Sequence, residues 1–262
     1  MTAAAVIQFA PLLAQTEIHN RAEGEASCVA QNKAFCLDWA LDNFDRYTTP
    51  LLEHLVLVVV SVAMGFLVAF AMALLSHRRR WLVPTFTGAT GVLYTIPSLA
   101  FFFLLLPVTG RGTDTAIIAL TAYTLQIIYR NIVAGLANVP VESREAGRGM
   151  GMTHRQLLWR VELPLALPEI IAGLRVATVS TVAIATLAVF AGAGGLGQPI
   201  YQELDFKTNI VIAGGLAILM AIVFDALLVV ALRLMAPWRG REPASARRRH
   251  RLATLRRAPE AA

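Results

Sequence analysis

Residues 142–168 read ESREAGRGMGMTHRQLLWRVELPLALP. This stretch is charged and helix-forming, and it separates two long apolar segments of the chain. Crossing a lipid bilayer requires apolar helices of about 20 residues but no charged insert of this kind. The insert therefore predicts an element that lies outside the bilayer and makes a contact there.

The composition of the chain indicates an integral membrane protein. The chain has 262 residues, of which 56% are hydrophobic and 15% are charged, and its mean hydropathy is +0.60. Soluble domains carry about 25% charged residues, so this chain is depleted in charge. Its length allows several membrane spans but leaves no room for a second large globular domain.

Five apolar stretches are long enough to cross a membrane as helices. The sequence thus predicts an all-α fold, a polytopic membrane helix bundle. The expected spans are residues 51–75, 83–108, 114–132, 169–191 and 209–235. The second contains Pro84, Pro97 and Pro107, so we expect kinks or a broken helix there. Asp114 is expected to cap the third span.

The spans divide the chain into three regions. An N-terminal segment (1–50) precedes a transmembrane domain (51–236), which contains the insert (138–168), and a basic tail (237–262) follows. The first 15 residues are apolar but lack a basic start, so they make a poor signal peptide.

The distribution of basic residues predicts the orientation. Most of the 23 Lys and Arg residues fall in the insert, in the loop that contains Arg78, Arg79 and Arg80, or in the tail, all on one side of the expected spans. Because cytoplasmic loops carry the excess of Lys and Arg, the insert and the C-terminus are expected in the cytosol and the N-terminus outside. This bias accounts for the net charge of +6 without nucleic acid. The tail can also contact anionic membrane lipid.

The cysteines indicate no metal site. Cys28 and Cys36 are the only two, and no His or Cys partner stands at metal-ligand spacing. Both precede the first span, where an extracytoplasmic location would permit a disulfide. Two unpaired thiols are the preferred interpretation. We expect neither a metal nor a cofactor.

Within the insert, the residues predict two short helices joined by a glycine turn. Pro140 can begin the first helix. Thr153 is a good N-cap for the second, with Gln156 three residues later as in a capping box. We expect the prolines at 164 and 168 to end that second helix. Such an element suits docking into a groove on a cytosolic partner, and the alternative is a charged loop that only joins two spans.

The insert resembles the "EAA" motif of permease subunits of bacterial ABC importers. Glu145-Ala146-Gly147 is followed by Gly151 and then by Val161-Glu162-Leu163-Pro164, at the family's spacing. Gly147 and Val161 depart from the usual Ala and Ile, and a glycine loosens a helix by up to about 1 kcal/mol relative to alanine. The resemblance covers about residues 50–238. Within the family, the chain is most similar to the osmoprotectant branch, which imports glycine betaine, carnitine or choline. The stretches that carry this likeness are 94–100, 129–131, 148–153, 162–168 and 192–197.

The resemblance implies a set of partners and a coupling role for the insert. In that family two permease subunits, identical or paralogous, form the pore in the inner membrane. Two cytosolic ABC ATPase subunits drive it, and a separate extracytoplasmic binding protein delivers the solute. The residues that would couple this chain to the ATPase are Glu145, Ala146, Gly147, Gly151, Leu163 and Pro164.

The chain is not expected to be an enzyme by itself. It contains no Gly-x-x-x-x-Gly-Lys-Ser/Thr phosphate loop, so ATP hydrolysis must come from another subunit. No acid–base or nucleophile constellation is evident either.

Four residues are candidates for the solute pathway: Tyr94, Phe102, Tyr123 and Asp225. Aromatic side chains suit quaternary ammonium ligands, although packing is the commoner role at helical spacing. Asp225 falls mid-span, where pairing with Arg130, Arg175 or a polar backbone group is the preferred interpretation.

The alternatives for function are an ABC permease for methionine or another amino acid, an ion-coupled secondary transporter, and a membrane scaffold.

Overall fold

The computed structural model describes residue 28 and residues 31–237, which form helices, turns and no strand. The expectations for the first 15 residues and for the tail after Pro237 fall outside these residues. The helices are α2 (Leu37–Asp42), α3 (Asp45–Arg78), α4 (Leu82–Thr95), α5 (Ser98–Thr109), α6 (Thr113–Ala137), α7 (Val141–Gly149), α8 (His154–Leu157), the π-helical η1 (Leu158–Glu162), α9 (Leu163–Ala185), the 3₁₀ η2 (Thr186–Ala191), α10 (Gly197–Gln202) and α11 (Lys207–Met235).

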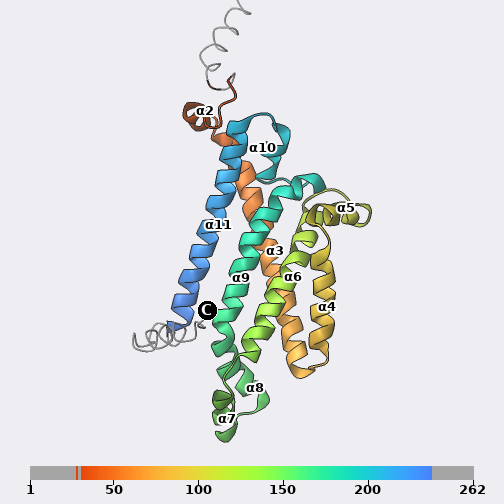
Figure 1. Ribbon diagram of the computed structural model, residues 1–262, viewed down its shortest axis with the longest axis vertical. Helices are drawn as coiled ribbons and strands as arrows, with labels where there is room; N and C mark the ends of the chain where they lie inside the picture. The colour runs from red at the N-terminus through yellow and green to blue at the C-terminus, as the bar shows by residue number, and fades with distance from the viewer. Residues whose placement is uncertain (1–27, 29–30, 238–262) are drawn as a thin grey trace, which may run out of the picture.

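The predicted helix bundle with about five spans is confirmed. Four helical stretches are each long and apolar enough to cross a membrane, and the bent pair α4–α5 adds a fifth. α6 lies in the middle and packs against α3, α4, α5 and α9, while α11 packs on α9. In Figure 1, α7 and α8 lie at the bottom, here termed the insert end, and α2 and α10 lie at the top, termed the cap end.

Of the three prolines in the second expected span, only Pro97 breaks the helix. The axes of α4 and α5 meet at 97°, and both Ile96 (ψ 127°) and Pro97 (ψ 133°) have extended backbone. A proline drives the preceding residue out of the helical region, which explains a sharp break rather than a kink. Pro84 lies in the first turn of α4, where it disrupts no helical hydrogen bond, and Pro107 lies within α5.

Small residues allow the central helices to approach closely. A Cβ added at Gly173 of α9 would lie 2.3 Å from the Cβ of Asn131 on α6, and one at Gly65 of α3 would lie 1.7 Å from Thr124 Oγ1. Alanines 69, 116, 119 and 177 are fully buried in the same interfaces. This packing sets a rigid three-helix core of α3, α6 and α9.

Asp114 does not cap α6, contrary to the sequence-based expectation. The helix begins at Thr113 with Gly112 as N-cap, and no side chain caps it. The backbone N–H of Gly112 instead donates to the carbonyl of Ala191, 2.9 Å away. Asp114 lies in the first turn, where its charge still interacts favourably with the helix dipole.

The glycine-rich turn after η2 is fixed to the first span. The N–H of Gly195 donates to Glu53 Oε2 (2.9 Å), and the N–H of Leu196 donates to His54 Nδ1 (3.3 Å). His54 Nε2 lies 3.1 Å from the carbonyl oxygen of Val182. Since Nδ1 accepts, Nε2 carries the proton and donates to Val182, which defines a neutral tautomer. The buried imidazole thus joins α3, α9 and the turn.

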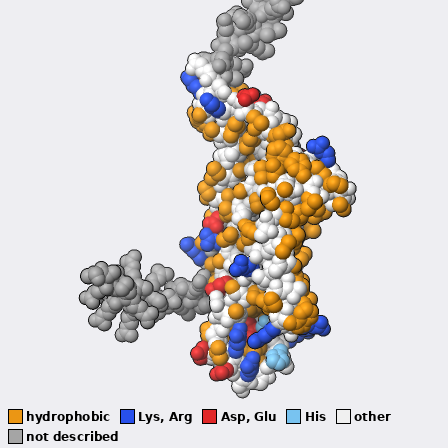
Figure 2. Space-filling view, turned by 45° about the vertical axis from the view of Figure 1, so that its right-hand side comes forward, with side chains coloured by type: hydrophobic (Ala, Val, Ile, Leu, Met, Phe, Trp, Pro, Cys, Tyr) orange, Lys and Arg blue, Asp and Glu red, His pale blue; other side chains and the backbone are white. Residues whose placement is uncertain are grey.

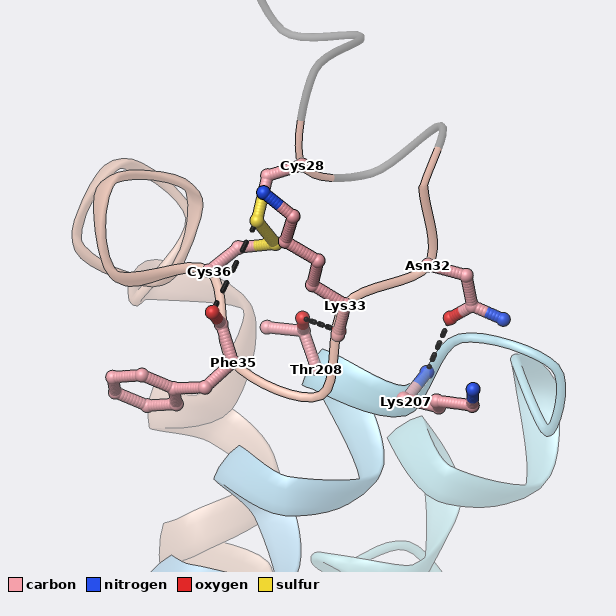
Figure 3. The surroundings of a disulfide bond; sticks show 7 residues. All are labelled: Cys28, Asn32, Lys33, Phe35, Cys36, Lys207 and Thr208. Atoms are coloured by element: carbon pink, nitrogen blue, oxygen red, sulfur yellow. Dashed lines mark hydrogen bonds between the residues drawn. A yellow bond between two sulfur atoms is a disulfide. The ribbon is translucent and has the colours of Figure 1, made fainter.

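Cys28 and Cys36 form a disulfide, so the preferred interpretation of two free thiols was wrong. Their Cα atoms lie 5.9 Å apart, within bonding range. The intervening loop folds onto the start of α11 (Figure 3): the Oδ1 of Asn32 accepts from the Lys207 N–H (3.0 Å), and the Lys33 carbonyl accepts from Thr208 Oγ1 (2.8 Å). These long-range contacts hold Asn32 and Lys33, which lie between the two cysteines, against α11, and the sequence spacing alone does not reveal them.

The cap end is tied down by further contacts. Arg46 pairs with Glu203, and its guanidinium lies 5.4 Å from the ring centroid of Trp39. Trp39 in turn packs edge-on against Phe206, with ring centroids 4.7 Å apart. Residues 31–46 are therefore packed against the α10–α11 turn.

We predict that the full chain, extracted from membranes and denatured, reacts with a maleimide–polyethylene glycol only after reduction. Both thiols are held in the disulfide, so reduction should yield a gel shift corresponding to the two cysteines of the chain. Cys28→Ser is the control and should label once without reduction. Labelling of the unreduced wild type would contradict the disulfide.

Candidate coupling site

The charged insert forms the insert end of the bundle, beyond the ends of the spans (Figure 1). Figure 2 shows acidic, basic and histidine side chains gathered there, in contrast to the apolar middle. α7 begins after Pro140, as expected, and carries Glu145 and Ala146 on its exposed surface. Both of these predicted coupling residues are exposed.

Gly151 makes the turn between α7 and α8. Its φ is +74°, a left-handed conformation that favours glycine. The turn is closed by hydrogen bonds from the N–H of Gly151 to the carbonyl of Arg148 (2.9 Å) and from the N–H of Met152 to that of Gly147 (3.1 Å). Nothing lies within 4 Å of where a Cβ of Gly151 would be. Its role is therefore conformational.

The capping box predicted at the start of α8 is confirmed. Thr153 Oγ1 accepts from the backbone N–H of Gln156 (3.3 Å), and Gln156 Oε1 accepts from the backbone N–H of Thr153 (2.8 Å).

Pro164 and Pro168 do not end the second helix of the insert, contrary to expectation. α8 runs through η1 into α9, giving one helical stretch from His154 to Ala191. Immediately before Pro164, the N–H of Leu163 donates to the carbonyl of Leu158, a wider π turn. Such a turn accommodates a local irregularity without ending the helix. The insert is thus rigidly continuous with the α9 span.

The other predicted coupling residues occupy packed positions. Gly147 is buried, and a Cβ there would lie 2.6 Å from Leu157 Cδ1, so α7 and α8 pack through this glycine. Leu163 is buried in the core at the insert end. Pro164 lines a shallow surface groove of about 330 Å³ with Ser143 and Arg160. Gly147 and Leu163 are thus buried and Pro164 is partly buried, whereas Glu145 and Ala146 lie on the outer surface of the insert.

A triad of Glu162, Arg144 and His77, which the sequence reasoning missed, holds the insert against the spans. Glu162 of η1 is 5% exposed. Its carboxylate lies 2.9 Å from Arg144 Nε of α7 and 3.1 Å from His77 Nε2 of α3. Arg144 also donates to the carbonyl of Leu136, at the end of α6. A carboxylate this deeply buried requires such partners, because desolvating an unpaired charge is costly. The available sequence signal was an acid directly before Leu-Pro, at the start of the apolar fourth span.

Asp225 pairs with Arg175, as expected. Arg175 Nε and Nη2 donate to the two carboxylate oxygens at 2.7 and 2.8 Å. This bidentate pair joins α9 to α11 and neutralises both charges, which suits a position within a span.

The aromatic pathway candidates separate into two environments. Phe102 is fully buried in the core, so its role is packing. Tyr123 is also buried, donates its hydroxyl to the Ile96 carbonyl and packs edge-on against Phe101. Tyr94 is 45% exposed, lies 5.9 Å from the Tyr123 ring and lines a cavity of about 430 Å³ with Gln126, Arg130 and Asn131.

In the described part of the chain, no group of three or more His, Cys, Asp or Glu side chains could hold a metal ion.

Comparison with known proteins identifies the family. The model of the family described as "binding-protein-dependent transport system inner membrane component" matches residues 61–238. The chain belongs to this family. The resemblance inferred from the insert is thereby confirmed, and the chain is a permease.

Named relatives of the permease match over most of their length. The choline transport system permease protein OpuBB of Bacillus subtilis is 37% identical over 187 residues, covering 71% of this chain and 86% of the relative. The osmoprotectant import permease protein OsmW of Salmonella typhimurium is 38% identical over 199 residues, covering 73% and 93%. The glycine betaine/carnitine/choline transport system permease protein OpuCB of B. subtilis is 35% identical, covering 71% and 86%.

Solved structures confirm the permease fold. A chain of the MetNI methionine ABC transporter in an inward-facing conformation superposes with a TM-score of 0.60 at 24% identity, covering 71% of this chain and 93% of that one. A chain of an amino acid ABC transporter gives a TM-score of 0.64 at 19% identity, covering 76% and 98%. At these identities the likeness concerns the fold alone.

We predict that Arg144→Met lowers the free energy of unfolding by about 3 kcal/mol, because the buried carboxylate of Glu162 loses its guanidinium partner. The double variant Arg144→Met/Glu162→Met buries no unpaired charge and should be more stable than the single variant. The measurement is denaturant unfolding of the detergent-solubilised chain, followed by tryptophan fluorescence.

The control for this cycle is Arg148→Met, since Arg148 is exposed on the same helix and makes no ion pair among the described residues. Strictly additive effects of the two substitutions would refute the coupling between Arg144 and Glu162.

Proposed function

We propose that the permease is the membrane subunit of an ATP-driven importer for a quaternary-amine osmoprotectant such as glycine betaine, choline or carnitine. The observation that carries this proposal is the 35–38% identity to permeases of osmoprotectant, choline and carnitine systems over most of their length. Transport would proceed by alternating access through a pore made with a second permease subunit, a copy or a paralogue. A cytosolic ATPase and an extracytoplasmic binding protein complete the proposed importer.

The geometry of the insert supports coupling to the ATPase. Glu145 and Ala146 are exposed on α7, and α7 packs through Gly147 onto the helix that continues into α9. The triad around Glu162 ties the same unit to α3 and α7. A displacement of α7 by the ATPase would therefore be transmitted to the α9 span. In this proposal Glu145 and Ala146 contact the ATPase, and Gly147, Gly151, Leu163 and Pro164 hold the insert in shape.

The disulfide supports the proposed orientation. Disulfides persist in oxidising compartments and are rare in the cytosol. The Cys28–Cys36 bond lies at the cap end, opposite the insert, so it agrees with an extracytoplasmic N-terminus and a cytosolic insert.

The cavity beside Tyr94 supports a zwitterionic amine as the solute. The Tyr94 ring offers a π face, which attracts a quaternary ammonium group. Arg130 lines the same cavity and can pair with a carboxylate, which glycine betaine and carnitine carry and choline lacks. Asp225 is less suited to contact the solute, because Arg175 occupies both its oxygens.

The main alternative is a permease for methionine or another amino acid. It is favoured by the fold of the amino acid transporters and by Arg130, which suits any amino acid carboxylate. An ion-coupled secondary transporter is less well supported, since the charge pair between α9 and α11 is mutually neutralised.

We predict that proteoliposomes containing the co-purified complex take up radiolabelled glycine betaine, choline or carnitine in an ATP-dependent manner. Glu145→Arg should reduce this uptake at least about tenfold, because a reversed charge in the docking surface costs more than about 1.4 kcal/mol of docking free energy. Asp42→Arg, the same reversal at the cap end, is the control. Uptake of methionine but none of the three amines would overturn the proposed substrate, and normal uptake by Glu145→Arg would overturn the coupling role.

We further predict that Tyr94→Ala weakens uptake of the quaternary amine by about five- to thirtyfold, the effect of losing a cation–π contact of about 1–2 kcal/mol. Tyr94→Phe retains the ring and should transport nearly normally. Phe103→Ala is the control, because Phe103 is similarly exposed but packs against Phe190. Equal loss in Tyr94→Ala and Phe103→Ala would argue for a general packing defect.

A further inference from the structure

A cavity of about 760 Å³ opens at the insert end, between the spans and the insert. Its walls come from the end of α3, the α3–α4 turn, the last turns of α6, and the α7–α8 pair. This volume lies within the range of ordinary ligand sites, about 300–1,000 Å³. None of the predicted coupling or pathway residues lines it.

The polar wall of this cavity is strongly basic. Five cationic or potentially cationic side chains line it: His77, Arg80, Arg144, Arg148 and His154. Among the described lining residues the one acid is Glu162, and its carboxylate is already occupied by Arg144 and His77. The acid therefore does not cancel the remaining charge.

Arg80 and Arg148 carry that remaining charge. Both side chains are exposed, and no acidic side chain pairs with either one in the part of the chain that the structure describes. Arg80 comes from the α3–α4 turn and Arg148 from α7, so the two arginines that line the cavity belong to different elements. Figure 2 shows basic and histidine side chains concentrated at this end.

Another part of the cavity wall is apolar. It consists of side chains from the ends of the spans, Val83 and Pro84 of α4 and Val133, Leu136 and Ala137 of α6. A cavity lined both by arginines and by the apolar ends of spans suits a ligand that carries an anionic group next to hydrocarbon. Arginine pairs with phosphate through two parallel hydrogen bonds, which makes phosphate the favoured anion.

We propose that this cavity binds a phosphate group, carried by an anionic phospholipid or by a free phosphate species. Arg80 and Arg148 contact the phosphate oxygens, and the apolar wall receives the glycerol and first acyl carbons when the ligand is a lipid. Basic pockets between spans on the cytoplasmic side hold anionic headgroups by this chemistry. Because Arg80 belongs to the spans and Arg148 to the insert, the bound phosphate bridges the insert to the bundle.

The test uses the complex that co-purifies with the tagged full-length permease in detergent. Bound lipid is removed from this complex before the titrations. Phosphatidylglycerol, zwitterionic phosphatidylcholine and sodium phosphate are titrated separately, and binding is measured by native mass spectrometry and by the shift in thermal unfolding. The variants are Arg80→Gln and Arg148→Gln. Arg79→Gln and Arg155→Gln are matched controls, exposed on the same turn and on α8 but outside the cavity lining.

We expect phosphatidylglycerol to bind saturably and each cavity variant to weaken it about fivefold, the attraction of one basic residue to an anionic surface. Arg148→Lys should bind more tightly than Arg148→Gln but more weakly than the wild type, since lysine keeps the charge but cannot form two parallel hydrogen bonds to phosphate. If phosphatidylglycerol binds and millimolar phosphate does not compete, the ligand is a lipid headgroup. If phosphate alone gives the same variant-sensitive stabilisation, the ligand is a free phosphate.

The proposal is overturned if neither ligand binds saturably, or if the control variants lose as much affinity as the cavity variants. Equal binding of phosphatidylcholine and phosphatidylglycerol by all variants would also overturn it, since the arginines would then contribute nothing. These readouts do not depend on transport, so they stand apart from the test of the importer.

Discussion

The buried carboxylate of Glu162 is the interaction on which the geometry of the insert depends. Its partners, Arg144 and His77, come from α7 and α3, whereas Glu162 itself lies at the start of the α9 span. A carboxylate that is 5% exposed has lost most of its hydration, so its charge is stabilised mainly by these two side chains. The insert is therefore held in one orientation relative to two spans, and α7 has little freedom to swing independently.

Near the cap end, a neutral side chain joins the same helices in a similar way. His54, in its neutral tautomer, joins α3 to α9 and to the glycine-rich turn. A Cβ at Gly194 would lie 1.7 Å from Glu53 Oε2, so this glycine lets the turn approach the first span closely. α3 is thus attached to α9 at both ends, by His54 near the cap and by His77 near the insert. A displacement of α9 would consequently be shared with α3.

Much of this arrangement could be predicted from local sequence. The spans follow from apolar runs, the start of α8 from Thr153 and Gln156, and the Arg175–Asp225 pair from the cost of a charge within a span. These features depend on residues close in sequence or on one dominant energy term. The features that sequence reasoning missed depend on packing between distant segments. Between the disulfide-bonded cysteines, Asn32 and Lys33 rest on α11, and the triad requires α3, α7 and η1 to meet. Pro164 was read as a helix end because the π turn before it leaves no mark in the sequence pattern.

The contacts of the Asn32–Lys33 loop have a consequence for the order in which the chain is built. Their partners, Asp205, Lys207 and Thr208, lie more than 170 residues later in the sequence. A ribosome delivers the loop first and its binding surface only after the spans that lie between them. The loop consequently has no docking surface while the intervening spans are inserted. Its contacts at the cap end form only after the start of α11 has been synthesised. Formation of these contacts thus distinguishes a chain that includes the start of α11 from a truncated one that has only the first four spans.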